Sequence, residues 1–352
     1  MRNLNRNIPC YVFGTGSFGQ QTVRALLSQD IQVRAFVSNS DQRDTLDGLP
    51  ILKWSQIPKD EPSQILLAVF NREHALDQFY REAQQHLVGD IIMPWDFYGQ
   101  ISKQLGWQYW LQDAEQMNRY RPILDEAINL MEDEQSKVCL QRVFDFRNGA
   151  DIEYASFQHD DDQYFNEITM RGRDTVSCYI DIGAFDGANL SELEALVDVE
   201  CAFLFEPEES NYSQILAAKN SFQTKKLFIL PVAVSNDTKV LSFDGDQGES
   251  SKICEDGQEH VFSSSLDKMI PAHLQVDFVK MDVEGAELDV LAGGQKLLAR
   301  CRPTLAISLY HNWDDLWKIP QALDSTLVSY AYYVRQHMRN SFDLVLYAVP
   351  RS

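Results

Sequence analysis

The stretch CYIDIGAFDGANL, residues 178–190, places a strand, a glycine turn and a helix in immediate succession. Residues 178–182 are apolar and β-prone, and the segment ANLSELEALV after Gly187 has the apolar spacing of a helix. Glycines at 183 and 187 allow a tight turn in which a ligand can lie against bare backbone at a helix N-terminus. The stretch therefore predicts an α/β domain with a cofactor-binding turn.

Two acidic residues narrow the ligand class. Asp181 would disfavour the pyrophosphate of a dinucleotide in this turn, whereas a ligand ending in an ammonium group suits it. Glu206 lies 23 residues after Gly183, where a βαβ unit returns its second strand, and a carboxylate there can accept both ribose hydroxyls. Either acid alone could be a strand-end cap or a solvated loop residue. Together they predict a nucleoside with a cationic tail, as in S-adenosylmethionine.

Composition limits the classes of partner. The chain has 352 residues, 44% of them hydrophobic, which is enough for two domains, and its formal net charge of −21 argues against a nucleic-acid substrate. Its apolar runs are far shorter than the roughly 20 residues needed to span a bilayer, and the N-terminus lacks the pattern of a secretory signal. The six cysteines show no C-x-x-C spacing. We expect a cytoplasmic protein with no membrane partner.

A second glycine turn occurs near the N-terminus. Residues 10–19, CYVFGTGSFG, carry glycines 14, 16 and 19 in G-x-G-x-x-G spacing between a predicted strand and helix. The strand that follows ends at Ser38 and Asn39, where an NAD site would place an acid, and Asp41 comes only later. This pattern leaves three interpretations open: an NAD site, a site for another nucleotide or sugar, or a purely structural Rossmann-like domain.

The chain divides into three predicted segments. Residues 1–100 read as a Rossmann-like α/β domain, 101–175 as a partly helical connector and 176–352 as the domain that carries the turn at 183–187. Within the connector, Asp160–Asp162 lacks the further ligands and glycine of a calcium loop, so we interpret it as a solvated run.

A third cluster lies in VDFVKMDVEGAELDVLAGG, residues 276–294, where Asp282, Glu284 and Glu287 follow a predicted buried strand. Ligands of doubly wound sheets bind at the carboxyl ends of strands, so these acids share an edge with Glu206. Methyl transfer to a hydroxyl needs a base, and the candidates are His311, Asp282 and Glu284. Lys280 could instead orient a neighbour. A divalent metal on Asp282, Glu284 and an imidazole is the alternative, but the spacing fits no metal motif and we expect none.

The region from about 163 to 352 resembles the FkbM-type methyltransferases. The resemblance rests on YIDIGAFDG, FEPEESN, VAVS, SLDK, VDFVKMDVEGAELDVLAGG, ISLYH and the closing YYVRQHM and FDLVLYAVP. The order K-x-D-x-E-G-x-E, Lys280 to Glu287, after D-x-G-A-x-x-G is the most specific part. The N-terminal half loosely resembles nucleotide-binding modules of sugar-modifying proteins.

The resemblance implies a seven-stranded class I fold, S-adenosylmethionine as cofactor, and O-methylation of a hydroxyl on a sugar or other small metabolite. It implies that Glu206 binds the ribose and Ser235 lies near the adenine, with Asp237 as the nearest acid for that edge. The amino-acid end of the cofactor would be held by Asp181, Gly183, Ala184 and Gly187.

Two other functions stay open: an NAD-linked oxidoreductase that uses the N-terminal glycine turn, and a non-catalytic nucleotide-binding sensor. We expect the insertion 236–265, with Trp313 and Trp317, to contribute to acceptor specificity. A homo-oligomer is compatible with the sequence.

Overall fold

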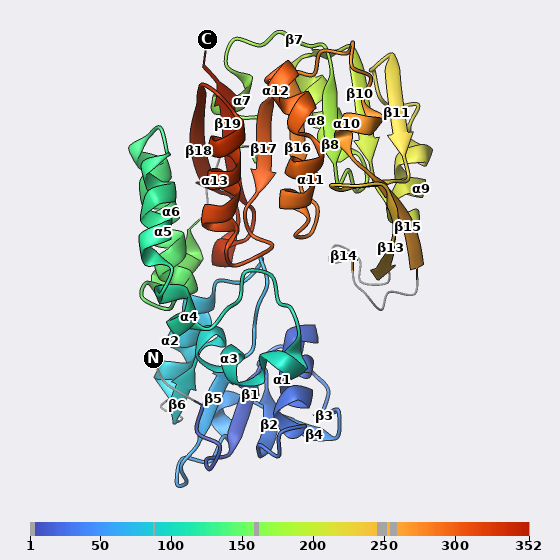
Figure 1. The fold of residues 1–352 in the computed structure, drawn as a ribbon. Helices are drawn as coiled ribbons and strands as arrows, with labels where there is room; N and C mark the ends of the chain where they lie inside the picture. The colour runs from blue at the N-terminus through green and yellow to red at the C-terminus, as the bar shows by residue number, and fades with distance from the viewer. Residues whose placement is uncertain (1–3, 87–88, 158–161, 245–251, 254–258, 352) are drawn as a thin grey trace. The chain divides into compact units, whose positions relative to one another are not determined.

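The computed structural model describes residues 4–86, 89–157, 162–244, 252–253 and 259–351, and the chain forms two compact units (Figure 1). The first unit comprises residues 1–125, 138–159 and 336–342, and the second comprises 126–137, 160–335 and 343–352. Two of the divisions fall inside helices, α5 (Arg121–Asn129) and α6 (Glu134–Arg147). Residues 101–175, predicted as a partly helical connector, contain both of these helices, and the segment is divided between the two units.

The first unit is built on a six-stranded sheet with the order β3-β4-β2-β1-β5-β6. Its strands pair in parallel except for the short β3–β4 hairpin. The strands are β1 (Cys10–Phe13), β2 (Val33–Val37), β3 (Thr45–Leu46), β4 (Leu49–Leu52), β5 (Gln64–Leu67) and β6 (Asp90–Ile92). The helices are α1 (Ser17–Leu27), α2 (Leu76–His86), α3 (Pro94–Leu105) and α4 (Ala114–Asn118), with short 3₁₀ turns η1 (Trp54–Gln56) and η2 (Ile152–Ser156). This is the Rossmann-like arrangement that the sequence predicts.

The second unit is built on a seven-stranded sheet with the order β11-β10-β8-β16-β17-β19-β18. In this sheet β19 pairs antiparallel with β17, while β11, β10, β8, β16 and β17 run parallel. The strands are β8 (Tyr179–Ile182), β10 (Cys201–Phe205), β11 (Lys226–Leu230), β16 (Phe278–Met281), β17 (Thr304–Ser308), β18 (Tyr330–Gln336) and β19 (Leu344–Pro350). The order confirms the predicted class I methyltransferase-like fold.

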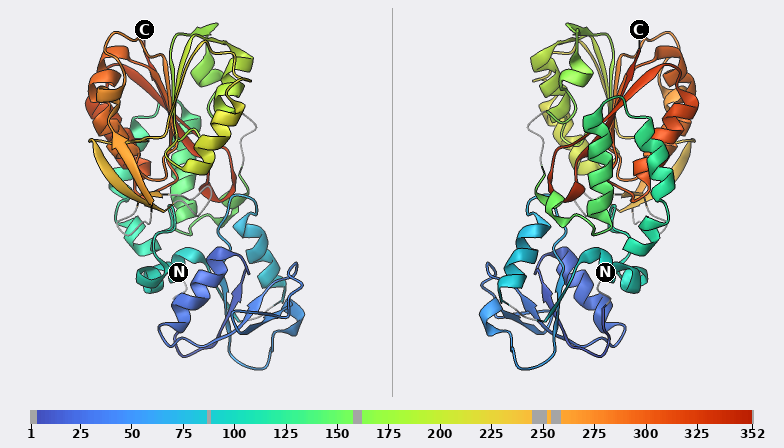
Figure 2. Two further views of the ribbon diagram at one scale, coloured as in Figure 1. Left: turned by 90° about the vertical axis from the view of Figure 1, so that its right-hand side faces the viewer. Right: turned by 90° about the vertical axis from the view of Figure 1, so that its left-hand side faces the viewer.

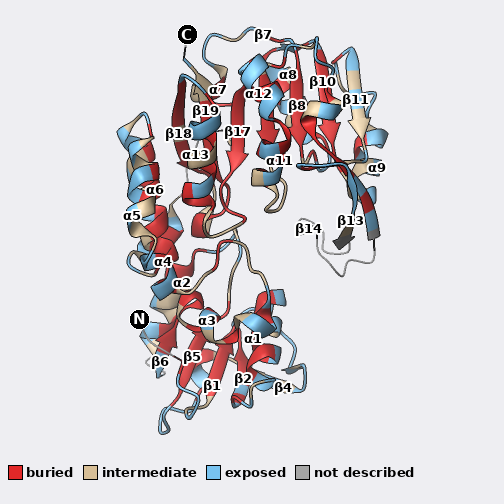
Figure 3. Ribbon diagram, in the orientation of Figure 1, coloured by how far each residue is buried: buried red, intermediate tan, exposed pale blue. Residues whose placement is uncertain are grey.

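Helices cover both faces of the seven-stranded sheet. In Figure 2, α8 (Ala188–Leu196) and α9 (Glu209–Ala218) lie on one face. On the other lie α11 (Glu287–Gly293), α12 (Gln295–Cys301) and α13 (Asp315–Thr326). Because both faces are covered, the central strands are buried along their whole length and mostly apolar rather than alternating, with Asp181 of β8 and Lys280 of β16 as the charged exceptions. Figure 3 shows these strands buried throughout.

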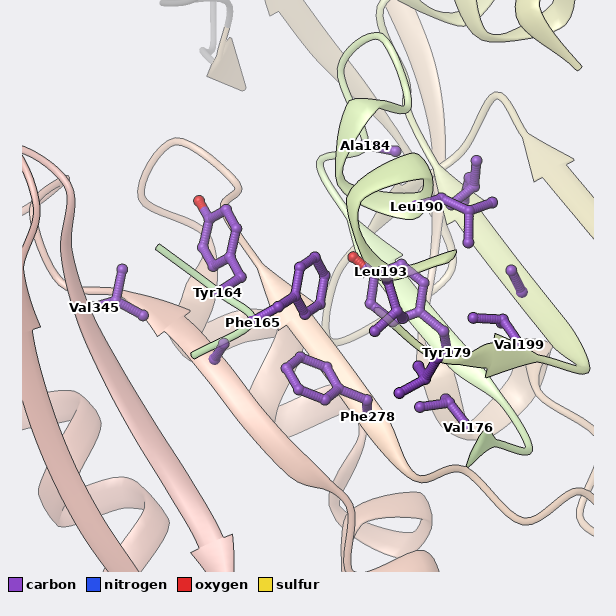
Figure 4. Close-up of a cluster of buried hydrophobic side chains, with 14 of the residues drawn as sticks. Tyr164, Phe165, Val176, Tyr179, Ala184, Leu190, Leu193, Val199, Phe278 and Val345 are labelled. Atoms are coloured by element: carbon purple, nitrogen blue, oxygen red, sulfur yellow. The ribbon is translucent and has the colours of Figure 1, made fainter. Parts of the chain in front are cut away.

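The core of this unit is aromatic on one side of the sheet. Phe165, Tyr179 and Phe278 pack with ring centroids 5.4 to 5.9 Å apart (Figure 4). Phe165 precedes the short helix α7 (Glu167–Met170), whereas Tyr179 and Phe278 are the opposed first residues of β8 and β16. Tilted and edge-to-face ring pairs of this kind add to the free energy of apolar burial. The cluster fixes the central strands whose carboxyl ends carry the candidate site.

Smaller elements complete the second unit. A four-stranded sheet, β12-β15-β13-β14, contains the antiparallel pair β13 (Lys239–Asp244) and β15 (Glu259–Ser264), both of which lie in the insertion 236–265. The others are β12 (Ala233–Val234) and β14 (Lys252–Ile253) with α10 (Leu266–Met269), the pair β7 (Thr175–Val176) and β9 (Asp198–Val199), and the turn η4 (Arg339–Ser341). Parts of the insertion 236–265, together with Asp160 and Asp161, lie outside the described residues.

In the part of the chain that the structure describes, no helix combines the length and apolar character needed to cross a membrane.

Candidate active site

The carboxyl ends of four parallel strands meet at one edge of the seven-stranded sheet. These strands lie side by side in the order β10-β8-β16-β17, and the loops after them carry the predicted site residues. Glu206 follows β10 directly, Asp282 follows β16 directly, and His311 stands three residues after β17. In doubly wound sheets, ligands bind at this edge.

The glycine turn after β8 is held against the two neighbouring strands. The backbone N–H groups of Gly183 and Ala184 donate to the carbonyl of Phe205 at 3.0 and 3.1 Å. Gly183 has φ +80°, and a Cβ atom there would stand 1.9 Å from the carbonyl oxygen of Asp282, so only glycine fits. Gly187 then forms the N-cap of α8. Phe185, between the glycines, has a positive φ of 51° and is 40% exposed.

Glu206 is a buried residue that binds the glycine turn. Its two carboxylate oxygens accept the backbone N–H groups of Phe185 at 2.8 Å and Glu208 at 2.9 Å, and the residue is 5% exposed. Burial raises the pKa of Glu206 to about 7, although both N–H groups and Lys280 oppose the rise. The structure therefore excludes the solvated-loop interpretation of this residue.

Asp181 and Lys280 form a buried ion pair. They are directly opposed on β8 and β16, and the ammonium nitrogen of Lys280 lies 3.1 Å from Oδ1 of Asp181. The same nitrogen donates to the carbonyl of Gly183 at 2.6 Å. Burial raises the pKa of Asp181, and the charge of Lys280 works against that rise. Asp181 is fully buried, so it supports the glycine turn through Lys280, which has the orienting position considered for it from the sequence.

Three carboxylates surround the imidazole of His311. Nδ1 lies 2.7 Å from Oε1 of Glu287, while Nε2 lies 3.2 Å from Oδ1 of Asp282 and 3.7 Å from Oε2 of Glu284. The imidazole is fully buried, but the side chains of Asp282 and Glu284 are 21% and 20% exposed. The structure thus brings together all three predicted catalytic residues and adds Glu287, which the sequence showed only as a neighbouring acid.

The charges of the cluster stabilise one another. Burial disfavours a charged His311 ring, but Glu287, Glu284 and the hydrogen bonds to Asp282 and Glu287 raise its pKa well above the ordinary value. Burial likewise acts to raise the pKa of Asp282, yet His311, Lys280 and Tyr164 outweigh it and lower that pKa far below its usual range. Both shifts favour a protonated ring among ionised carboxylates.

Two tyrosines that sequence reasoning missed complete the cluster. The hydroxyl of Tyr164 donates to Oδ2 of Asp282 at 2.8 Å, and that of Tyr310 lies 3.1 Å from Oδ1. Tyr164 comes from the segment interpreted as connector, where no local pattern marks it. Tyr310 precedes His311 directly and is the one that its position could have indicated. Both hydroxyls fix the orientation of the Asp282 carboxylate.

The residue predicted near the adenine packs against the end of α11. Ser235 follows β12, is 2% exposed, and its backbone N–H donates to the carbonyl of Ser264 at 3.0 Å. A Cβ atom on Gly293, the last residue of α11, would stand 2.1 Å from the carbonyl oxygen of Ser235. The carboxylate of Asp237 accepts the ammonium of Lys268 at 2.9 Å, so this acid is already engaged.

In the first unit, the acid nearest the N-terminal glycine turn is also engaged. Asp41 accepts the guanidinium of Arg43 in an ion pair of 2.6 Å. Gly19 packs so closely that a Cβ atom would stand 2.1 Å from the carbonyl oxygen of Gly14, whereas Gly16 has open space around it. Backbone packing thus accounts for part of the G-x-G-x-x-G spacing without a ligand.

The fold and the loops at this sheet edge define a class I methyltransferase-like domain. Comparison with known proteins adds the family: residues 181–340 match the sequence model described as the methyltransferase FkbM domain. These residues are accordingly an FkbM domain, and the FkbM family is one of methyltransferases. No curated protein matches the chain.

One solved structure shares the fold over most of the chain, and others are similar to a smaller extent. The crystal structure of a methyltransferase FkbM from Methylobacillus flagellatus KT is similar with a TM-score of 0.77 and 21% sequence identity, over 97% of this chain and 89% of that chain. An rRNA methylase from Streptococcus thermophilus is similar with a TM-score of 0.33 and 12% identity, over 50% of this chain and 87% of that one. A precorrin-6y C5,15-methyltransferase from Geobacter metallireducens GS-15 is similar with a TM-score of 0.31 and 13% identity, over 51% of this chain and 82% of that one.

Proposed function

We propose that this protein is an S-adenosylmethionine-dependent methyltransferase that methylates a hydroxyl of a sugar or another small metabolite. The observation that carries the proposal is one sheet edge holding both a glycine turn anchored by a buried Glu206 and the carboxylate cluster around His311. A cofactor turn and a proton-accepting cluster at one edge are what an alkyl transfer to a hydroxyl needs.

The residues present fit this cofactor in charge and in hydrogen-bonding capacity. Each carboxylate oxygen of Glu206 accepts one backbone N–H and has a further lone pair with which it can accept a ribose hydroxyl. The edge is rich in carboxylates, which suits a cofactor with a cationic sulfur and an ammonium group. We propose that the backbone of Gly183, Ala184 and Gly187 holds its amino-acid end, with Asp181 acting through Lys280. Ser235 stays the candidate for the adenine edge.

When bound, S-adenosylmethionine supplies an electrophilic methyl group on a positively charged sulfur. The protein's own part is to align an acceptor oxygen in line with that group and to take up the hydroxyl proton. Asp282 and Glu284 are the partly exposed members of the cluster and would face the acceptor. His311 is buried beneath them, so we propose that it sets their charge and orientation, while one of these two carboxylates takes up the hydroxyl proton.

The acidic character of the protein favours a neutral or cationic acceptor over a nucleic acid or a membrane surface. A cytoplasmic location is proposed as well. It is supported by five described cysteines, all buried and none in a disulfide: Cys10, Cys139, Cys178, Cys201 and Cys301.

Calorimetric titration of the purified protein tests the proposal. S-adenosylmethionine and S-adenosylhomocysteine are expected to bind, and NAD is not. A signal with NAD alone would favour the oxidoreductase interpretation of the N-terminal turn. Binding of the adenosyl compounds without methyl transfer to a broad panel of sugars and small alcohols would favour a sensor.

A further inference from the structure

We propose that Asp282, Glu284 and His311 form a binding site for a divalent metal ion, with Glu287 orienting the imidazole. The sequence predicted no metal here, because the spacing matches no known motif. The inference comes instead from how the loops after β16 and β17 converge. One ligand atom from each of Asp282, Glu287 and His311 lies within 4.8 Å of the other two, and Glu284 joins this group on the Nε2 side of the ring, whereas Glu287 contacts Nδ1.

The separations match those of ligands that share a metal. With metal–ligand bonds of about 2.1 Å, neighbouring ligand atoms stand roughly 3.0 to 3.4 Å apart. Nε2 of His311 lies 3.2 Å from Oδ1 of Asp282, within that interval, and 3.7 Å from Oε2 of Glu284. Glu284 closes the remaining gap by a small side-chain rotation, for which its 20% exposure leaves room.

The other side of the ring carries the contact expected of a metal-bound histidine. A histidine that binds a metal through one nitrogen usually donates its other N–H to a carboxylate, which fixes the tautomer. Nδ1 of His311 lies 2.7 Å from Oε1 of Glu287, and this oxygen also accepts the backbone N–H of Val283 at 3.1 Å. Nε2 is therefore the nitrogen directed at the exposed carboxylates, and its proton would leave to solvent when the metal binds.

Charge and an unsatisfied atom point to a cation independently of these distances. Three carboxylates surround one imidazole, so even a protonated ring leaves an excess of negative charge in a largely buried place. Lys280 is committed to Asp181 and to the Gly183 carbonyl. In addition, Oε2 of Glu287 is fully buried and has no hydrogen-bond partner among the described residues, although Oε1 of the same carboxylate contacts the ring that the ion would bind. A buried carboxylate with an unpartnered oxygen is stabilised by a nearby cation.

The donor set indicates the kind of ion. Carboxylate oxygens suit Mg²⁺ and Mn²⁺, and one imidazole among them shifts the preference toward Mn²⁺ and neighbouring transition metals. The catalytic use of such an ion rests on the proposed function: it would bind the acceptor oxygen and make its hydroxyl more acidic. The binding itself does not depend on that function.

To test this, Mn²⁺ is titrated into the full-length protein after a chelator has removed bound metal, and free Mn²⁺ is followed by its electron paramagnetic resonance signal. The wild-type protein is expected to bind Mn²⁺ at one site, and Asp282→Asn and His311→Gln to weaken that binding by at least about tenfold. Asp289→Asn is the matched control, because this exposed acid lies on α11, the helix that begins at Glu287, and contacts Asn236 instead of the cluster. It is expected to bind Mn²⁺ like the wild type.

Two further measurements separate the outcomes. Mn²⁺ should raise the unfolding temperature of the wild type and of Asp289→Asn but not of Asp282→Asn, whose fold is checked by its own unfolding transition. The proposal is overturned if the wild type binds no Mn²⁺, or if Asp282→Asn and His311→Gln bind it as well as the wild type. S-adenosylmethionine binding by metal-free protein that fails to bind Mn²⁺ would leave the proposed function standing. Mn²⁺ binding by a protein that does not bind S-adenosylmethionine would support the metal site and contradict the proposed function.

Discussion

At the scale of single residues, the site is made of charged groups whose partners are supplied by the backbone or by one another. Glu206 is held by two N–H groups, Asp181 by Lys280, and His311 by its carboxylates. Removing a buried charged group leaves its partner unpaired, which costs more than the contact itself. Substitutions at these positions therefore have large effects that can be assigned to a defined partner.

Glu206→Ala is expected to weaken the binding of S-adenosylmethionine strongly. The change removes charge-assisted bonds to the ribose worth about 1.5 to 3 kcal/mol, which corresponds to roughly a ten- to hundredfold rise in Kd. Calorimetry on the variant measures this directly. Glu209→Gln, an exposed acid three residues along the chain, is the control and should bind normally. An unchanged Kd in Glu206→Ala would remove the ribose role from this residue.

The raised pKa of Glu206 predicts a pH dependence near neutrality. Because its pKa is raised from 4.5 to about 7, the carboxyl takes up a proton as the pH falls through that value and loses acceptor capacity for the ribose. Cofactor affinity should therefore fall between about pH 8 and pH 6. The contribution of Glu206 to the stability of the free protein has the opposite pH dependence. It is fully present below the unfolded-state pKa and is lost as the pH rises through the folded-state pKa. Glu206→Gln should flatten both profiles; a profile with the same midpoint in that variant would assign it to another group.

His311→Ala is expected to spare cofactor binding and to lower kcat. Loss of the imidazole leaves Asp282, Glu284 and Glu287 to repel one another and removes the group that sets their charge, so a fall on the order of a hundredfold or more is expected. The measurement compares kcat with the Kd for S-adenosylmethionine, using any hydroxylated acceptor that supports turnover. A normal kcat would show that Asp282 or Glu284 accepts the proton without help from the imidazole.

At the scale of elements, the site depends on the register of β8 against β16. That register sets Asp181 opposite Lys280 and brings the turn at Gly183 against the carbonyl of Asp282. Both contacts join chain segments that lie far apart in the sequence but belong to, or directly follow, neighbouring strands. A change in either contact should disturb the glycine turn before it disturbs the rest of the sheet.

Gly183→Ala is expected to destabilise the protein by at least about 2 kcal/mol. The added methyl group would meet the Asp282 carbonyl at 1.9 Å, and alanine is strained at the positive φ of this position. Denaturant unfolding measures the loss. Gly16→Ala is the control because no atom lies within 4 Å of the added carbon and its φ of −73° suits any residue. Equal stability of the two variants would mean that the turn is less tightly packed than described.

Lys280→Met is expected to cost about 3 to 5 kcal/mol of folding free energy, because it leaves Asp181 buried without its cation. The double variant Lys280→Met with Asp181→Asn should recover much of that loss, since the uncompensated charge is then gone. A double-mutant cycle of unfolding free energies checks this. Additive effects would show that the two side chains stabilise the fold independently.

At the scale of the whole molecule, the sequence predicted the fold well and the site in part. Strand-to-helix periodicity around 178–190 and 276–294 was sufficient to predict the glycine turn at 183–187, the acidic cluster after residue 281 and their shared sheet edge. The chemical need for a base made His311, Asp282 and Glu284 candidates for one role. Local patterns could not show that Asp181 is buried against Lys280, or that Tyr164 reaches Asp282 from far upstream. Such contacts are set by strand register and by chain segments that meet only after folding.

The central claim is that the turn between Gly183 and Gly187, with Glu206 beside it, is the binding site of an adenosyl cofactor. A crystal of the full-length protein soaked in S-adenosylmethionine tests this most directly. The account predicts electron density for the compound along that turn, with its ribose hydroxyls on the Glu206 carboxylate and its sulfonium methyl group toward Asp282 and Glu284. Density at another place in the molecule, or none at a saturating concentration, would contradict it.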